Sequence, residues 1–145
     1  MARTTIRELL DDFNAELARR FDVDASVRWF RTNDQTEQPL IPAYYVEPGA
    51  LSVVRTNVAS PQVEQTIRFL SESSANYIDV PDRLAAELDF FEKVMRDFMR
   101  EPFLPCGAFL LRATTFADAP SGFSVDAAES FCNVFGGAEF AFGLC

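Results

Sequence analysis

The side chains able to perform acid–base or nucleophilic chemistry are few, because the chain of 145 residues contains no histidine. Without an imidazole beside a serine or cysteine, the usual activated nucleophiles cannot be assembled. Lys93 is the only lysine. Its place beside Glu92 and Asp97 predicts a solvated ion pair on a helix, since lysine is rarely buried.

Carboxylates are the remaining candidates for catalysis. A glycoside-type reaction needs two of them facing each other across a bond, but sequence does not set the distances between them. Their spacing fits helix caps and polar helix faces equally well, so we expect no enzyme activity. The residues concerned are Asp11, Asp12, Asp22, Asp24, Asp79, Asp82, Glu87, Asp89 and Glu92.

No cofactor or metal is expected either. Asp22, Asp24, Asn33 and Asp34 supply oxygen ligands, but the twelve-residue calcium pattern with its central glycine is missing. The Gly136–Gly137 pair is not followed by a lysine, so it forms no phosphate-binding loop. We interpret the pair as a turn or bulge before a final strand.

The three cysteines, Cys106, Cys132 and Cys145, contain no Cys-x-x-Cys pair. This spacing argues against a zinc or redox motif and favours small buried residues in a reducing compartment. The N-terminus has no apolar leader and no run reaches the roughly 18 apolar residues of a membrane span. We therefore expect synthesis in the cytoplasm and no contact with a membrane.

Charge excludes another class of partner. Twenty-two acidic residues face 13 basic ones, which gives a net charge of −9. An anionic surface repels phosphate backbones, so a protein that reads nucleic acid is not expected.

The elements that must position these residues begin with an amphipathic helix over residues 6–20, opened by a capping box from Thr5 to Glu8. Alternation then predicts strands over residues 26–31 and 40–46. Pro48 and Gly49 occupy the positions that a type II turn requires, which predicts a reversal into residues 51–56.

The second half of the chain predicts a strand over residues 62–70 and a polar loop over 71–76. A second amphipathic helix over 82–99 is expected to be capped by Asp79 or Asp82 and ended by Pro102. A strand over 109–116 and a last strand over 138–144 follow, while residues 126–129 fit a single helical turn.

This order predicts one α+β domain spanning residues 1–145, with an antiparallel or mixed sheet and both helices on one face. The 15 phenylalanines are spread evenly. Packing in the core and at subunit interfaces explains them better than a stacking platform.

Two resemblances bear on function. The segment Pro81-Asp82-Arg83-Leu84-Ala85-Ala86-Glu87-Leu88-Asp89-Phe90 resembles a signature of the chaperones that mature molybdenum redox enzymes, with Arg83 in place of histidine. That family is all-helical and longer than this chain, so the predicted strands argue against it. A capped amphipathic helix produces the same letters.

The order of elements along nearly the whole chain resembles that of the tail terminator and tail-completion proteins of tailed phages. The likeness runs through the first helix, the proline-led segment 39–47, the long strand from residue 62, the aspartate-capped helix and the late strands. It implies a sheet flanked by helices. It also implies a virion subunit of the tail or neck, in a homo-oligomeric ring, usually of six copies, that joins tail tube to head.

The function of such a ring depends on the surfaces through which its subunits contact one another and other proteins. Partners would be other tail and neck proteins, and an acidic lumen would let DNA pass without binding. Exposed loops usually carry contacts, so we expect subunit or tube contacts in the predicted turn and polar loop: Pro48, Gly49, Ser71, Glu72, Ser73 and Tyr77.

Two other classes remain open. A cytosolic chaperone or peptide-binding module would offer a groove lined by phenylalanine and an exposed apolar patch. An enzyme that uses carboxylates alone would have a cleft with a raised carboxyl pKa.

Overall fold

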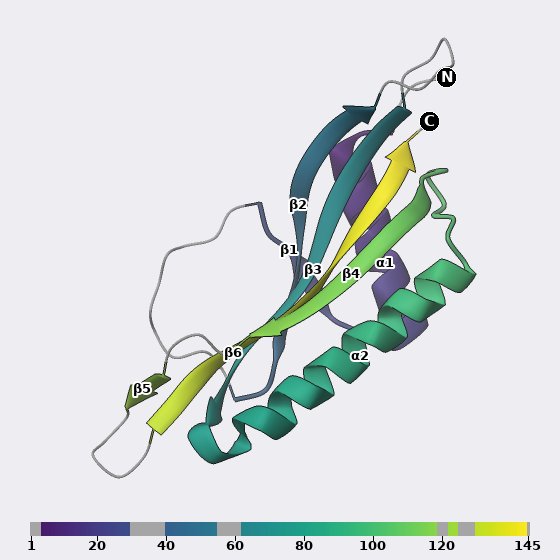
Figure 1. Ribbon diagram of the computed structural model, residues 1–145. Helices are drawn as coiled ribbons and strands as arrows, with labels where there is room; N and C mark the ends of the chain where they lie inside the picture. The colour runs from purple at the N-terminus through teal and green to yellow at the C-terminus, as the bar shows by residue number, and fades with distance from the viewer. Residues whose placement is uncertain (1–3, 30–39, 55–61, 119–121, 125–129, 145) are drawn as a thin grey trace.

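The first helix forms as its periodicity predicts. In the computed structural model, which describes residues 4–29, 40–54, 62–118, 122–124 and 130–144, helix α1 spans Ile6–Phe21 (Figure 1). The Thr5 hydroxyl accepts a hydrogen bond from the backbone N–H of Glu8 at 3.2 Å, which confirms the predicted start. The helix ends at Asp22, whose φ of 57° is left-handed, as is common just past a helix C-terminus.

The second helix, α2, spans Val80–Arg100 and follows a short 3₁₀ helix, η1, at Tyr77–Asp79. Pro81 lies in its first turn, where a missing N–H costs nothing. Asp79 occupies the predicted cap position, although its side chain makes no capping hydrogen bond. Neither α1 nor α2 combines the length with the apolar character that a membrane-crossing helix needs within the part of the chain described.

Six strands form a single mixed sheet in the order β1-β2-β3-β6-β4, with β5 paired to the start of β6. β1 runs parallel to β2, and every other pairing is antiparallel. From β2 to β4 the strand directions therefore alternate. The strands are β1 (Ala25–Val27), β2 (Ala43–Val54), β3 (Gln62–Asn76), β4 (Phe109–Asp118), β5 (Gly122–Ser124) and β6 (Ser130–Leu144).

Both helices pack against the same face of this sheet. The ring of Phe13 on α1 lies 5.0 Å from Phe98 on α2 and 5.0 Å from Phe140 on β6, measured between ring centroids. Phe91 on α2 lies 5.0 Å from Phe69 on β3. Six phenylalanines in this layer are fully buried: Phe13, Phe69, Phe91, Phe98, Phe140 and Phe142. The predicted α+β class, the single domain and the role of phenylalanine in the core are confirmed.

The predicted turn at Pro48 and Gly49 is wrong. Both residues lie inside β2, which continues to Val54 while its pairing with β3 shifts between Pro48 and Leu51. The Gln65 side chain donates hydrogen bonds to the carbonyls of Gly49, at 3.0 Å, and Ala50, at 3.5 Å. A bulge therefore replaces the reversal, and Gln65 satisfies backbone groups that the ladder leaves free.

The predicted polar loop over residues 71–76 is also wrong. These residues continue β3 and pair with the first half of β6, from Phe135 opposite Glu72 to Phe131 opposite Asn76. The last strand accordingly begins at Ser130 and not at residue 138. β5 and the start of β6 extend past the beginning of α2 in Figure 1.

Gly136 and Gly137 form no turn, because both are regular members of β6. A Cβ added to Gly136 would lie 3.0 Å from Cβ of Glu87, so this glycine lets α2 approach the sheet. The predicted helical turn over residues 126–129 lies outside the described residues.

Candidate functional site

The face of the sheet turned away from the helices is a candidate site. No helix covers it among the residues described, and we call it the open face. Its side chains alternate with those of Phe69 and Phe140, which point toward the helices. From β2 to β4 it carries Tyr45, Glu47, Arg68, Leu70, Glu72, Gly137, Glu139, Thr114 and Phe116.

A row of charges crosses the open face. Glu47 pairs with Arg68 across β2 and β3, and Arg68 lies opposite Glu139 on β6. Arg28 continues the row just after β1, where its backbone N–H bonds to the carbonyl of Val46. The sequence Arg–Glu–Arg–Glu across four neighbouring segments keeps this part of the face close to neutral.

Glu47 is the centre of this row and is 3% exposed. Its carboxylate lies 3.1 Å from Nε of Arg28 and 3.3 Å from Nε of Arg68. Arg28 also binds Glu72 at 3.0 Å and places its guanidinium 3.9 Å from the ring centroid of Tyr45. Burial disfavours the charge of Arg28, but its hydrogen bond to Glu72 and the nearby carboxylates outweigh burial and raise the pKa of Arg28.

Two glycines of β6 let apolar side chains close over the open face. Leu70 and Phe116 lie on either side of Gly137, and an added Cβ there would come within 2.6 Å of Leu70 Cδ2. The ring of Phe109 covers Gly143 in the same way. Aromatic rings on the edge strand therefore protect the glycine backbone of its neighbour.

Judged from the described part of the chain, both edges of the sheet are open over part of their length. β4 is the outer strand on one side, and past Leu110 no described residue pairs with its free edge. On the other side, β1 covers only Tyr44–Val46 of β2. The rest of β2 exposes Leu51 (56%) and Val53 (63%), which we call the β2 edge patch. Open edges are templates for pairing with another strand.

A groove of about 750 Å³ runs between α2 and β4, along the free edge of the sheet. Met95, Met99, Leu111 and Ala113 form its apolar floor, and Met99 is 52% exposed. Its rim carries three arginines, Arg96, Arg100 and Arg112, against one glutamate, Glu92. Arg96 is paired with Glu92 and Arg112 with Glu64, so the rim is largely neutralised. We call this hollow the α2–β4 groove.

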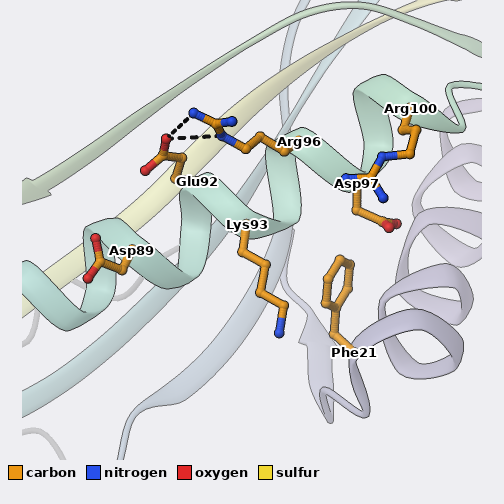
Figure 2. Close-up of a pocket in the computed structure, with 7 residues that line it drawn as sticks. All are labelled: Phe21, Asp89, Glu92, Lys93, Arg96, Asp97 and Arg100. Atoms are coloured by element: carbon orange, nitrogen blue, oxygen red, sulfur yellow. Dashed lines mark hydrogen bonds and ion pairs between the residues drawn. The ribbon is translucent and has the colours of Figure 1, made fainter.

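Figure 2 shows a second hollow, of about 520 Å³, between α2 and Phe21 at the end of α1. Lys93 is exposed and extends into it, so it is not a buried base. Its exposure agrees with the prediction of a solvated lysine, while the neighbouring Glu92 binds Arg96 at 2.8 Å. Exposed charges of both signs line the hollow, and nothing in it resembles a nucleophile with its base.

Arg20 ties the two helices together beside this hollow. Its guanidinium binds Glu16 at 2.8 Å and Asp97 at 3.1 Å, and it lies 4.4 Å from the ring centroid of Phe98. The hydrogen bond from Arg19 is the largest influence on Glu16 and lowers the pKa of this carboxyl, with Arg20 adding to the effect against the cost of burial. This cluster stabilises helix packing.

A buried polar cluster lies under the first half of α2. Glu87 is 4% exposed and accepts a hydrogen bond of 2.6 Å from the Ser71 hydroxyl. Arg83 donates to the Ser73 hydroxyl at 2.9 Å. Burial of Tyr44 nearby, together with the negative charge of Glu87, raises the pKa of the tyrosine. None of the hollows described above is lined by these residues. The cluster therefore accounts for the presence of buried serines in β3, whose hydroxyls bind side chains of α2, and it does not indicate a ligand site.

The residues predicted as contacts are scattered by the fold. Pro48 and Gly49 lie in the bulge of β2, and Ser71 and Ser73 are buried under α2. Glu72 belongs to the Arg28 network on the open face. Only Tyr77, 69% exposed at the start of η1, lies free on the surface as predicted for all six. That Tyr77 contacts a neighbouring subunit stays a prediction.

Sequence reasoning missed the surfaces just described. The sequence shows that polar and apolar residues alternate around Glu47 and around Arg68. That these two residues face each other depends on which strands are neighbours in the sheet. Met99 falls outside the buried stripe of α2, which was a signal for an exposed apolar residue. No group of three or more potential metal ligands occurs in the described residues.

No protein-family model matches this chain, and no curated protein matches it either.

Proposed function

We propose that the chain is a structural, ring-forming subunit of a phage-like virion, which completes or terminates a tail and joins the tail tube to the head. The proposal combines the whole-chain resemblance to tail terminator proteins with the surfaces of the sheet. Other tail and neck proteins are then its partners, and the virion tail or neck is its location.

One observation supports a repeating assembly of identical chains. Over the residues described, the sheet ends in two different open edges, β4 on one side and the distal half of β2 on the other. Two different surfaces that pair with each other form a head-to-tail contact, and such contacts close into rings when the rotation between copies allows it. A single chain therefore carries both halves of a repeating interface.

The open face suits a surface past which DNA moves without binding. Arg28, Glu47 and Arg68 alternate in sign across neighbouring segments, and Glu47 pairs with both arginines, so their positive charge is partly neutralised before a phosphate could approach. A neutral or acidic face releases few counterions on contact with DNA and gains little affinity from it. We place this face toward the lumen of the ring.

A peptide-binding module with a phenylalanine-lined groove is supported less well. Six phenylalanines are fully buried in the core. The apolar floor of the α2–β4 groove is lined by methionine and leucine. Methionine is typical of adaptable binding surfaces, so an extended segment could dock here. The exposed edge of β2 on the same chain can supply such a segment, which favours self-association over binding of a foreign peptide.

The test is electron microscopy of the purified full chain in negative stain at several concentrations. The proposal predicts annular particles with a stain-filled centre and one dominant rotational symmetry. Uniform small particles without a central hole at every concentration would contradict it.

A further inference from the structure

We infer that the ring interface is an antiparallel pairing of the β2 edge of one copy with the free edge of β4 in the next, with the β2 edge patch seated in the α2–β4 groove. This inference rests on the proposed ring, and it specifies which surfaces meet.

The strand directions support this pairing. They alternate from β2 through β3 and β6 to β4, so β4 runs opposite to β2 within one copy. We place the strands along the ring axis, because copies related by rotation about that axis then keep the same strand directions. The β2 strand of the next copy therefore runs antiparallel to β4, which gives the more stable type of ladder.

The faces also match. Leu51 lies opposite Gln65 and Val53 opposite Val63, on the side of the sheet that carries Ile67, Phe69 and the helices. Residues directly opposite each other share a face. In a sheet continued from one copy to the next, Leu51 and Val53 therefore arrive on the helix side of β4. The α2–β4 groove lies on that side.

Chemistry completes the fit. The β2 edge patch is apolar and more than half exposed, and the floor of the groove is apolar with Met99 half exposed. Each surface alone leaves apolar area in water that pairing would remove. At the rim, Arg96 is paired with Glu92 at 2.8 Å and Arg112 with Glu64 at 2.9 Å, so charge places little obstacle in the way of an apolar strand.

The test uses three lysine substitutions in the full chain and measures native mass across a concentration series. Val53→Lys alters the patch and Met99→Lys alters the groove. Leu88→Lys is the matched control, because Leu88 is an exposed apolar residue of the same helix (39%) that does not line the groove. All three positions are exposed, so each variant is expected to unfold at the same denaturant concentration as the parent chain.

We expect Val53→Lys and Met99→Lys each to raise the midpoint concentration of association at least tenfold, and Leu88→Lys to change it less than twofold. Mixing the first two gives the decisive result. Each variant retains the half-interface that the other has lost, so an equal mixture should form one-to-one dimers that cannot grow into rings.

Three outcomes would overturn the inference, and they separate it from the ring itself. If all three variants form rings as the parent does, the ring stands and another surface holds it. If the two variants fall apart but mixing restores nothing, these positions do not face each other across a head-to-tail contact. If the parent chain is a monomer at every concentration, the ring proposal fails together with the inference.

Discussion

Replacing Glu47 by glutamine tests the charge row of the open face. The substitution keeps the shape of a side chain that is 3% exposed and removes its charge between Arg28, at 3.1 Å, and Arg68, at 3.3 Å. Breaking a buried ion pair costs about 3–5 kcal/mol when the remaining charge has no other partner.

Here the cost should be smaller, because both arginines retain some compensation. Arg28 keeps Glu72 at 3.0 Å, and the Arg68 side chain is 39% exposed to water. We therefore expect Glu47→Gln to lower the free energy of unfolding by about 2 kcal/mol.

Glu64→Gln is the matched control on the neighbouring strand. Glu64 binds Arg112 at 2.9 Å, but the Arg112 side chain is 64% exposed. An ion pair with such an exposed partner contributes about 0–1 kcal/mol. The measurement is urea unfolding at neutral pH, followed by far-ultraviolet circular dichroism, on both variants and the parent chain.

A double-mutant cycle sharpens the result. If Arg28 and Glu47 act as one unit, Arg28→Met combined with Glu47→Gln should cost less than the sum of the two single changes, by about 1 kcal/mol or more. Equal costs for Glu47→Gln and Glu64→Gln, or strict additivity in the cycle, would refute the reasoning from burial.

Three further predictions concern packing, pH and DNA. Gly137→Ala should destabilise the chain by about 1–3 kcal/mol in the same urea assay, because the new methyl meets Leu70 and the backbone of Phe69; an unchanged midpoint would contradict the close packing over β6. Since the pKa of Glu16 is lowered in the folded state, its carboxylate stabilises the fold above its ordinary value of 4.5, and this contribution is lost as the pH falls through the lowered value. Glu16→Gln should therefore be less stable than the parent at pH 7, with the gap narrowing as the pH falls below 4.5; a gap of constant size from pH 7 into the acid range would show that charge is not its source. In fluorescence anisotropy at 0.15 M salt, a duplex DNA probe should bind no more tightly than about 10⁻⁴ M, the weak end of non-specific binding; micromolar binding would contradict a lumen for passing DNA.

The helices and the α+β class could be predicted because their signals are local. Helical spacing and caps lie within a few residues of each other in sequence, and α1 and α2 form with boundaries within one or two residues of those expected. The strand over residues 109–116 was also predictable, because its residues favour strands and proline and glycine precede it.

The errors arose where tertiary contacts overrule local preference. Pro48 and Gly49 satisfy the rules for a turn, but Gln65 supports a bulge there and the strand continues. Ser71 and Ser73 look like loop residues, yet they are buried because Glu87 and Arg83 reach them from α2. A glycine is required at position 136 because α2 lies against it. The residues next to it in sequence give no sign of that contact.

The candidate surfaces could not be predicted for a related reason. The open face and both free edges depend on strand order, which alternation within a strand does not determine. The groove depends on where α2 crosses β4. These features follow from pairing between distant segments.

The most direct test of the central claim is the native mass of the purified chain, measured by light scattering across a concentration series. The account predicts a closed assembly of defined size, several times the 16.3 kDa of one chain and about six times for the ring that the resemblance implies. A mass of 16.3 kDa at every concentration would contradict the account, and a mass that grows without limit would contradict a closed ring.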